Sequence, residues 1–407
     1  MQIQSMIYVS TGNLPSEIAH SVQIAKMAQA FSKEINKFEL LTSGDIISFI
    51  KGMDHNFQEW YGLNSAFKLV RLPIKLKLEY PLANNYYLPK GFLKLAIFYT
   101  LLKFPDLVYT RTAAFVEIML KIGYPVIWEF HEPIDSSSPY KSFLTDKSLI
   151  GIVTTLPQIA ETYLKQGLPS EKLFIAPNAA DLSNFEPYQN KSVARQKISI
   201  PLNTKLVVYS GHLYDYKGIP TILETAKMVS DCQFLLVGGW KEDIKKIKQI
   251  CEQTNLNNVS IIGHVKHSEL ASYLYAADIL ILPTSQYWNL ANATCPLKLF
   301  DYMAVKRPIV ASALPTIMTI LSDQQNAILA EPDNGLSFEK ALKTLFQNPS
   351  LGEKIAERAF LDVQKMTWAN RAKNILNFAS ERLEFLEYKR SHRLNYLFKY
   401  LKLTLSK

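Results

Sequence analysis

Short apolar runs alternate with amphipathic stretches along almost the whole chain of 407 residues. The runs that we expect to form strands are 6–10, 38–42, 107–109, 126–130, 150–154, 173–176, 206–210, 234–237, 259–262, 279–282, 309–311 and 327–329. Apolar residues at helical spacing lie between several of them, at 17–31, 219–229, 244–252 and 268–275. Strands that alternate with helices pair in parallel, because each helix returns the chain to the same end of the sheet. The sequence therefore predicts an α/β fold with parallel sheets and helices on both faces.

The alternation is interrupted between residues 182 and 200, where polar residues and prolines collect. A chain of this length can bury two cores of ordinary size. We therefore predict two Rossmann-like domains, 1–185 and 186–366, and a C-terminal segment, 367–407. Open parallel sheets bind ligands at the carboxyl ends of their strands, so we expect both sets of strand ends to face a central cleft.

Composition excludes several classes of protein. The three cysteines stand at unrelated spacings, which indicates a reducing compartment such as the cytoplasm and no disulfide framework. No cluster of cysteines and histidines, and no D-x-D pair, suggests a metal site, so we expect no metal and no cofactor. The N-terminus lacks the pattern of a signal peptide. The longest apolar stretch, 91–104, is too short for an ordinary membrane span and contains Lys94 and Lys103.

The net charge of +9 is concentrated in segments where basic residues alternate with bulky apolar ones. Two such segments are 67–78 and 389–407, and the second has the spacing of a basic amphipathic helix. This pattern fits an anionic membrane surface, or a solvated face with extended lysines, better than it fits nucleic acid. We hypothesise that both segments rest on the inner face of the membrane as a peripheral contact.

The stretch from Ala293 to Ser312 carries the strongest chemical signal. Pro296 is expected in the first turn of a short helix whose first amides lack partners in the helix, which makes a phosphate cradle. Lys298 adds positive charge, and Asp301 supplies an acceptor at the distance of a ribose. The residues that we expect to contact a donor here are Thr294, Cys295, Pro296, Leu297 and Asp301.

This stretch resembles glycosyltransferase family 4, the retaining nucleotide-sugar transferases of GT-B fold, in which the donor helix often reads S-P-x-K-x-F-E-Y-M-A. The family carries two glutamates eight positions apart. Asp301 stands in the place of the second, which contacts the ribose, and Ala293 stands in the place of the first. Alanine cannot bond a sugar hydroxyl through its side chain. Lys306 stands where the family commonly has glycine.

The start of the second domain, residues 209–218, also resembles the family. Gly211 allows close approach of the backbone to a ligand. The resemblance implies that His212 and Lys217 contact the donor diphosphate, with His212 replacing an arginine and Lys217 standing at the start of the next helix. In the turn formed by Gly263, His264 and Val265, the family receives the nucleobase through backbone groups.

In the first domain, residues 14–24 resemble the P-S-E-x-A-H-x-x-Q loop and helix of one branch of the family. Ser16 is expected to cap the helix. Ser16, His20 and Gln23 are expected on the acceptor side, and His20 and Gln23 are expected to face the cleft. His131 follows the strand 126–130, and the matching histidine in the family lies beside the transferred sugar. We treat the turn 177–181 as a landmark of the family without chemistry of its own.

The resemblance implies a retaining glycosyltransferase. Its catalytic residues would be His131, Lys217 and His212, its donor a nucleotide sugar, and its acceptor a saccharide or a lipid-linked group, in envelope or exopolysaccharide assembly. A catalytically weak GT-B protein that acts as a binding or partner subunit is the alternative, motivated by Ala293 and His212. A sugar-nucleotide epimerase is a third class, whose usual carboxylates and histidines are not found.

Overall fold

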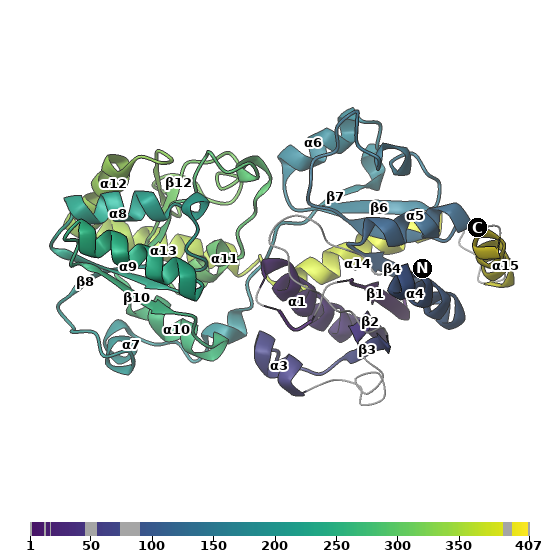
Figure 1. Ribbon diagram of the computed structural model, residues 1–407, viewed down its shortest axis with the longest axis horizontal. Helices are drawn as coiled ribbons and strands as arrows, with labels where there is room; N and C mark the ends of the chain where they lie inside the picture. Colours follow the sequence, from purple (N-terminus) through teal and green to yellow (C-terminus); the bar gives the residue numbers. More distant parts are fainter. Residues whose placement is uncertain are drawn as a thin grey trace. The chain divides into compact units, whose positions relative to one another are not determined.

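The computed structural model describes residues 2–11, 14–16, 18–44, 55–73, 90–385 and 393–405. The chain divides into two compact units. The first unit is Met1–Pro177 with Trp368–Lys407, and the second is Asn178–Thr367 (Figure 1). The end of the chain therefore returns to the first unit.

A parallel sheet forms the centre of the first unit; in the described residues it has seven strands in the order β3-β2-β1-β4-β5-β6-β7. These strands are β1 Ser5–Val9, β2 Lys37–Gly44, β3 Lys68–Pro73, β4 Leu107–Thr110, β5 Val126–Glu129, β6 Leu149–Thr154 and β7 Leu173–Ile175. The helices of this unit are α1 Ala19–Glu34, α3 His55–Tyr61, α4 Lys90–Lys103, α5 Ala113–Ile122, α6 Pro157–Lys165, α14 Trp368–Phe385 and α15 Arg393–Leu405, with 3₁₀ turns η1 Lys141–Phe143 and η2 Ser170–Lys172.

The second unit has the same plan. Its parallel sheet has, in the described residues, six strands in the order β10-β9-β8-β11-β12-β13. These strands are β8 Lys205–Ser210, β9 Cys232–Val237, β10 Val259–Gly263, β11 Ile279–Leu282, β12 Ile309–Ser312 and β13 Ile328–Ala330. The helices are α7 Lys191–Lys197, α8 Ile219–Met228, α9 Lys241–Gln253, α10 His267–Ala276, α11 Leu297–Ala304, α12 Gly335–Gln347 and α13 Pro349–Val363, with 3₁₀ turns η3 Leu182–Phe185, η4 Asp215–Lys217 and η5 Ala291–Ala293.

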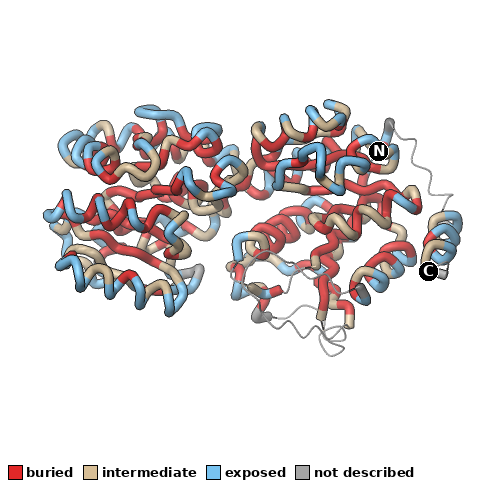
Figure 2. Tube along the Cα trace, turned by 45° about the horizontal axis from the view of Figure 1, so that its top comes forward, coloured by how far each residue is buried: buried red, intermediate tan, exposed pale blue. Residues whose placement is uncertain are grey.

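Central strands are apolar because helices cover both faces of each sheet. In β8, Leu206 and Val208 belong to the core on one face, whereas Val207 and Tyr209 belong to the core on the other. Every residue of β11 is buried. Figure 2 shows buried segments through the middle of each unit and exposed residues on the outside. Strands of this kind read as continuous apolar runs, and this pattern is why the sequence revealed them.

All twelve expected strands form, with shifts of one or two residues at their ends. The sequence missed β3, which pairs with β2 at the edge of the first sheet. Leu69, Val70 and Leu72 of this strand are buried in the core of the unit. The membrane contact expected for 67–78 is therefore wrong for 68–73, because these apolar side chains are already covered. Residues 74–78 lie outside the described part of the chain.

The helix α14 completes the first unit. It packs against α1 and β6, and Ile375, Ala379 and Leu383 on it are fully buried. Among the residues that the structure describes, no helix is both long enough and apolar enough to cross a membrane.

Candidate functional site

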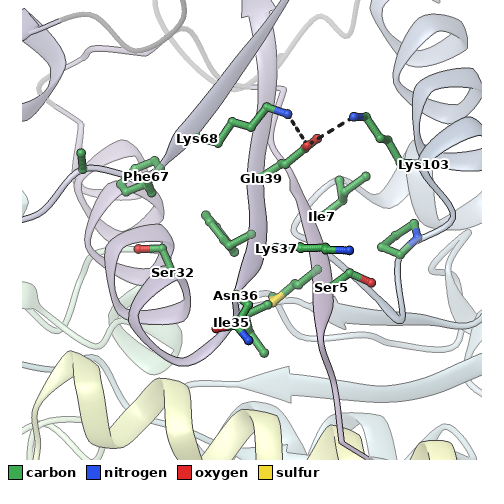
Figure 3. Close-up of a pocket in the computed structure, with 14 residues that line it drawn as sticks. Ser5, Ile7, Ser32, Ile35, Asn36, Lys37, Glu39, Phe67, Lys68 and Lys103 are labelled. Carbon is green, nitrogen blue, oxygen red and sulfur yellow. Dashed lines mark hydrogen bonds and ion pairs between the residues drawn. The ribbon is translucent and has the colours of Figure 1, made fainter.

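The residues that carry chemistry form one group in each unit, in both cases at the carboxyl ends of the parallel strands. A pocket of about 610 Å³ in the first unit lies elsewhere, because its lining comes from the amino ends of the strands (Figure 3). Ser5, Lys37 and Lys68 mark those ends. Sheets of this type bind their ligands at the opposite edge, so this pocket is not the candidate site.

In the second unit, the loop after β8 begins at Gly211. Its backbone has a φ of 132°, a value that favours glycine, and its amide donates to the carbonyl of Val237 at 2.8 Å. A Cβ at this position would meet the ammonium of Lys298. The glycine therefore lets a lysine from α11 reach the end of β8.

The ammonium group of Lys298 is held by the side chain of Tyr209. Its ammonium donates to the hydroxyl of Tyr209 at 2.8 Å and lies 3.9 Å from the centre of that ring. Burial, and then repulsion by Lys217, lower the pKa of Lys298 well below its ordinary value, while Asp301 raises it. Lys298 therefore lies within electrostatic range of both Lys217 and Asp301.

Lys217 is the last residue of η4, and Gly218 separates it from α8. We expected Lys217 at the start of this helix, but it lies two residues before the first helical residue. Its ammonium lies 4.0 Å from the centre of the Trp288 ring and 5.2 Å from that of Tyr216. Burial lowers its pKa to about 8. No ion pair between Lys217 and a carboxylate is found in the described ranges.

The helix α11 begins one residue later than expected. Pro296 is its N-cap, with an extended ψ of 127°, and Leu297 is the first helical residue. No side chain caps this end. The carbonyl of Cys295, which lies just before it with Thr294, accepts from the Asn178 amide at 2.6 Å. The positive end of the helix dipole therefore lies two residues from Lys298.

The other donor-side predictions are placed as follows. The ring of His212 stacks on those of Tyr214 and Trp240, with centres 5.2 Å and 5.4 Å away. Gly263 ends β10 with a φ of 83°, and its carbonyl accepts from Gly238 at 2.6 Å.

His264 is exposed, and Val265 packs against the core. The structure shows no ligand, so the contacts of these residues with a donor stay predictions.

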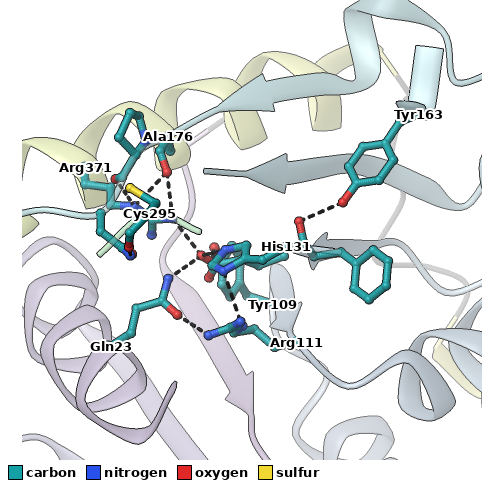
Figure 4. A network of polar contacts seen from close by, with 12 residues as sticks. Gln23, Tyr109, Arg111, His131, Tyr163, Ala176, Cys295 and Arg371 are labelled. Atoms are coloured by element: carbon teal, nitrogen blue, oxygen red, sulfur yellow. Dashed lines mark hydrogen bonds and ion pairs between the residues drawn. The ribbon is translucent and has the colours of Figure 1, made fainter. Parts of the chain in front are cut away.

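In the first unit, the fully buried Glu129 is the centre of a polar network (Figure 4). Its carboxylate accepts from Gln23 at 2.7 Å, from Tyr109 at 2.6 Å and from Arg371 at 2.6 Å. Burial alone would raise the pKa of Glu129, but Arg371, His131 and Arg111 hold it well below its usual value. The carboxylate is therefore ionised and pairs with a residue of α14.

His131 has a defined tautomer in this network. Its Nδ1 lies 3.1 Å from Nη2 of Arg111, and its Nε2 lies 2.9 Å from Glu129. Arginine can only donate, so Nδ1 accepts and Nε2 donates to the carboxylate. Burial, and then Arg111, lower the pKa of His131 to about 4. The imidazole is thus neutral near pH 7 and presents no proton to give from Nδ1.

The structure brings Gln23 and His20 to this network. Arg111 donates to the Gln23 side chain, and burial, Arg111 and His131 lower the pKa of His20 well below its usual value. The prediction that Ser16 caps this helix is wrong, because the N-cap of α1 is Ile18. The Ser16 amide donates instead to the hydroxyl of Tyr61 at 2.7 Å, since the loop turns before the helix begins.

Sequence reasoning missed several members of both groups. Glu129 had a signal, since a carboxylate within an apolar strand must find partners. Arg111 also had one, because it directly follows a strand. Arg371 and Trp288 had none, since each reaches its group from a distant part of the chain.

Comparisons with known proteins find similar chains and similar folds. Residues 190–362 match the family model described as "Glycosyl transferases group 1". A D-inositol 3-phosphate glycosyltransferase of Corynebacterium urealyticum is 23% identical over 261 residues, which are 60% of this chain and 60% of that protein. The first three curated relatives are matched over 60%, 50% and 44% of their length, so the chain spans about half of the relatives that it matches.

Solved structures share the fold over nearly the whole chain. A sucrose-phosphate synthase of Thermosynechococcus elongatus superposes with a TM-score of 0.71 at 17% identity, covering 93% of this chain and 98% of that one. HepE of Anabaena, in its complex with UDP-glucose, gives 0.66 at 13% identity, covering 93% and 99%. The expected fold class, with two Rossmann-like parallel sheets and GT-B glycosyltransferases as structural neighbours, is confirmed.

Proposed function

We propose that the protein is a glycosyltransferase that moves a sugar from a nucleotide-sugar donor to an acceptor hydroxyl. The observation that carries this proposal is the pair Lys217 and Lys298, beside the uncapped start of α11 and held by aromatic rings. Within the described residues, neither lysine forms an ion pair with a carboxylate. Half-buried cations of this kind are costly unless an anion binds them. A diphosphate fits this site, and HepE, a structural neighbour, was solved with UDP-glucose.

The proposed reaction breaks the bond between C1 of the sugar and the diphosphate oxygen. The electron pair of that bond stays on the departing oxygen, where Lys217, Lys298 and the amides at the start of α11 stabilise it. The acceptor oxygen then bonds to C1, and its proton goes to the departing phosphate. Attack on the same face of the sugar, with retention, is the finer part of the proposal and comes from the resemblance to family 4.

We further propose that the reaction needs no metal and no cofactor. Two lysines and a helix dipole at one site supply the positive charge that a divalent cation supplies in other transferases. Turnover that persists in excess EDTA, and that Mg²⁺ or Mn²⁺ does not raise, would agree with this proposal. Turnover abolished by EDTA and restored by either cation would contradict it.

The proposal also covers the cellular compartment and the acceptor. The three cysteines, Cys232, Cys251 and Cys295, form no disulfide, which favours action in the reducing cytoplasm. We propose a saccharide or lipid-linked acceptor in envelope or exopolysaccharide assembly, because the chain carries a basic amphipathic segment at its end.

The test is nucleotide release from UDP-, GDP- and ADP-sugars, after a thermal-shift screen has shown which of them raises the melting temperature. We expect one class of donor to bind and to be turned over slowly with water as acceptor. Lys217→Met should lose on the order of 100-fold in rate, whereas Lys227→Met, at an exposed position of α8, should not. A chain that no nucleotide sugar stabilises, or a fully active Lys217→Met, would refute the assignment.

A donor-binding partner subunit without activity is the second candidate. It is favoured by the ring of His212, which stacks on those of Tyr214 and Trp240, and by Ala293, which has no polar side chain. Donor binding without nucleotide release, with every acceptor tried, would support it over the enzyme. Release that depends on Lys217 would exclude it.

A further inference from the structure

The helices α4 and α15 pack together on the first unit, although almost 300 residues separate them in the sequence. The hydroxyl of Tyr400 on α15 donates to the carbonyl of Lys94 on α4 at 3.1 Å. Tyr396 packs against Phe104 and Tyr124, with ring centres 6.2 Å and 5.0 Å away. The last described helix is therefore fixed on the unit by specific contacts.

Both helices leave large apolar side chains in solvent. On α15, Leu394, Phe398 and Leu401 are 66%, 67% and 40% exposed. On α4, the exposed fractions are 40% for Leu95, 41% for Phe98 and 47% for Leu102.

The spacing of these residues keeps them on one side of each helix. On α4 the opposite side, with Phe92, Ile97 and Leu101, is buried in the core. We call these six exposed residues, together with Lys94, Lys399 and Lys402, the α4–α15 surface.

The charged residues of the two helices themselves have one sign. The sequences of α4 and α15 hold six lysines and arginines and no aspartate or glutamate. Lys94, Lys399 and Lys402 on the same two helices are exposed. A basic surface with protruding leucines and phenylalanines matches the headgroup and upper acyl region of an anionic bilayer.

We propose that the α4–α15 surface docks on a membrane rich in anionic lipids. Lysines meet the headgroups while the apolar side chains enter the interface. A second copy of this chain fits less well, because two such surfaces would bring three lysines against three. The proposal does not depend on glycosyl transfer, and its test needs no substrate. From the sequence, we expected the C-terminal segment and 67–78 to form the membrane contact. In this proposal α4 takes the place of 67–78.

The experiment is sedimentation of the full chain with vesicles of phosphatidylglycerol and phosphatidylcholine in equal parts, compared with pure phosphatidylcholine. We expect binding to the anionic vesicles only, weakened by salt. The triple variant Leu394→Ser, Phe398→Ser, Leu401→Ser should lose at least tenfold in affinity. So should Lys399→Gln with Lys402→Gln, because each basic residue near such a surface contributes about 1 kcal/mol.

Matched controls distinguish binding by this surface from nonspecific binding by exposed apolar side chains elsewhere. Met318, Leu336 and Leu361 of the second unit are 52%, 48% and 55% exposed, and their replacement by serine should leave vesicle binding unchanged. Circular dichroism and the melting temperature show whether each variant is folded. Equal binding by the triple variant and the wild type, or equal binding to neutral vesicles, would overturn the proposal. So would a dimer in light scattering that the triple variant loses.

Discussion

At the scale of single residues, the candidate donor site contains two lysines that contact aromatic rings. Lys217 rests on Trp288, a contact that holds an ammonium without neutralising it. Its pKa of about 8 means that burial makes the charged form unfavourable in the folded chain. Such a residue lowers the stability of the folded chain unless an anion binds it, which leads to two predictions.

The first prediction is that Lys217→Met stabilises the protein while it removes activity. Methionine fills similar space without a charge, so the free energy of unfolding should rise by about 1–2 kcal/mol at pH 7. Denaturant melts measure this change, and nucleotide release measures the loss. A variant that is both less stable and inactive would show that the lysine has a structural role.

The second prediction concerns pH. The Lys217 charge is present below about pH 8 and is lost above it, so kcat/KM for the donor should fall as pH rises through this value. The sign for stability is opposite. Between pH 8 and the unfolded pKa near 10.5, the unfolded chain binds more protons, so the cost of burying this lysine disappears as pH rises. Lys217→Met should remove this part of the pH slope, which melts from pH 7 to 10 would reveal.

The third prediction concerns Glu129 and Arg371, which form a buried ion pair at 2.6 Å. Arg371→Met should lower the free energy of unfolding by about 3–5 kcal/mol, because it leaves a buried carboxylate without its cation. The pKa of Glu129 should then rise, so the stability of this variant should fall as pH increases through the new pKa.

Adding Glu129→Gln to Arg371→Met should recover part of the loss and remove that pH dependence. Additive losses in the double variant, measured in the same denaturant melts, would mean that the pair is not coupled.

At the scale of elements, the buried strands could be predicted because a strand covered on both faces must be apolar throughout. The edge strand β3 could not, since Lys68 and Arg71 alternate with its buried residues and resemble an amphipathic surface. Helix starts were displaced by one or two residues at Ser16 and Pro296, because capping residues also favour the turns that precede helices. Lys306, where the family has glycine, has a φ of 51° just after α11, so the family glycine matches a left-handed position.

The fourth prediction tests how α14 meets its sheet. A Cβ on Gly151 in β6 would lie 2.5 Å from the ring of Phe378 on α14 and 2.9 Å from the carbonyl of Lys172. Gly151→Ala should therefore destabilise the protein by about 1–3 kcal/mol through overpacking. Phe378→Leu in the same chain should restore part of the loss, since the smaller side chain makes room for the methyl group. Calorimetry on the two single variants and the double variant measures this coupling, and an unchanged melting temperature in Gly151→Ala would contradict the close packing.

At the scale of the whole molecule, the two units differ in the number of chain segments that form them. The second unit is one continuous segment, Asn178–Thr367, whereas the first needs the end of the chain to return to it. Composition and motif order predicted two Rossmann-like sheets, but no local pattern revealed that Arg371 would pair with Glu129, 242 positions away. Contacts of this kind depend on the assembled fold. For this reason the sequence predicted His20, Gln23 and His131 of the network in the first unit, but not Arg371.

The fifth prediction follows from this asymmetry. A chain that ends after Thr367 lacks α14, so it leaves Glu129 without its cation and uncovers the core that Ile375, Ala379 and Leu383 fill. Its first unit should fail to fold, whereas the second unit should still unfold cooperatively and bind the donor at Lys217. A chain that ends after Phe385 keeps α14 and loses α15, so both units should fold and only vesicle binding should weaken. Calorimetry distinguishes the two chains, because the shorter one should lose the enthalpy of one whole unit, about 0.7 kcal/mol for each of its residues. If the shorter chain keeps the full unfolding enthalpy, the first unit is complete without its returning helix.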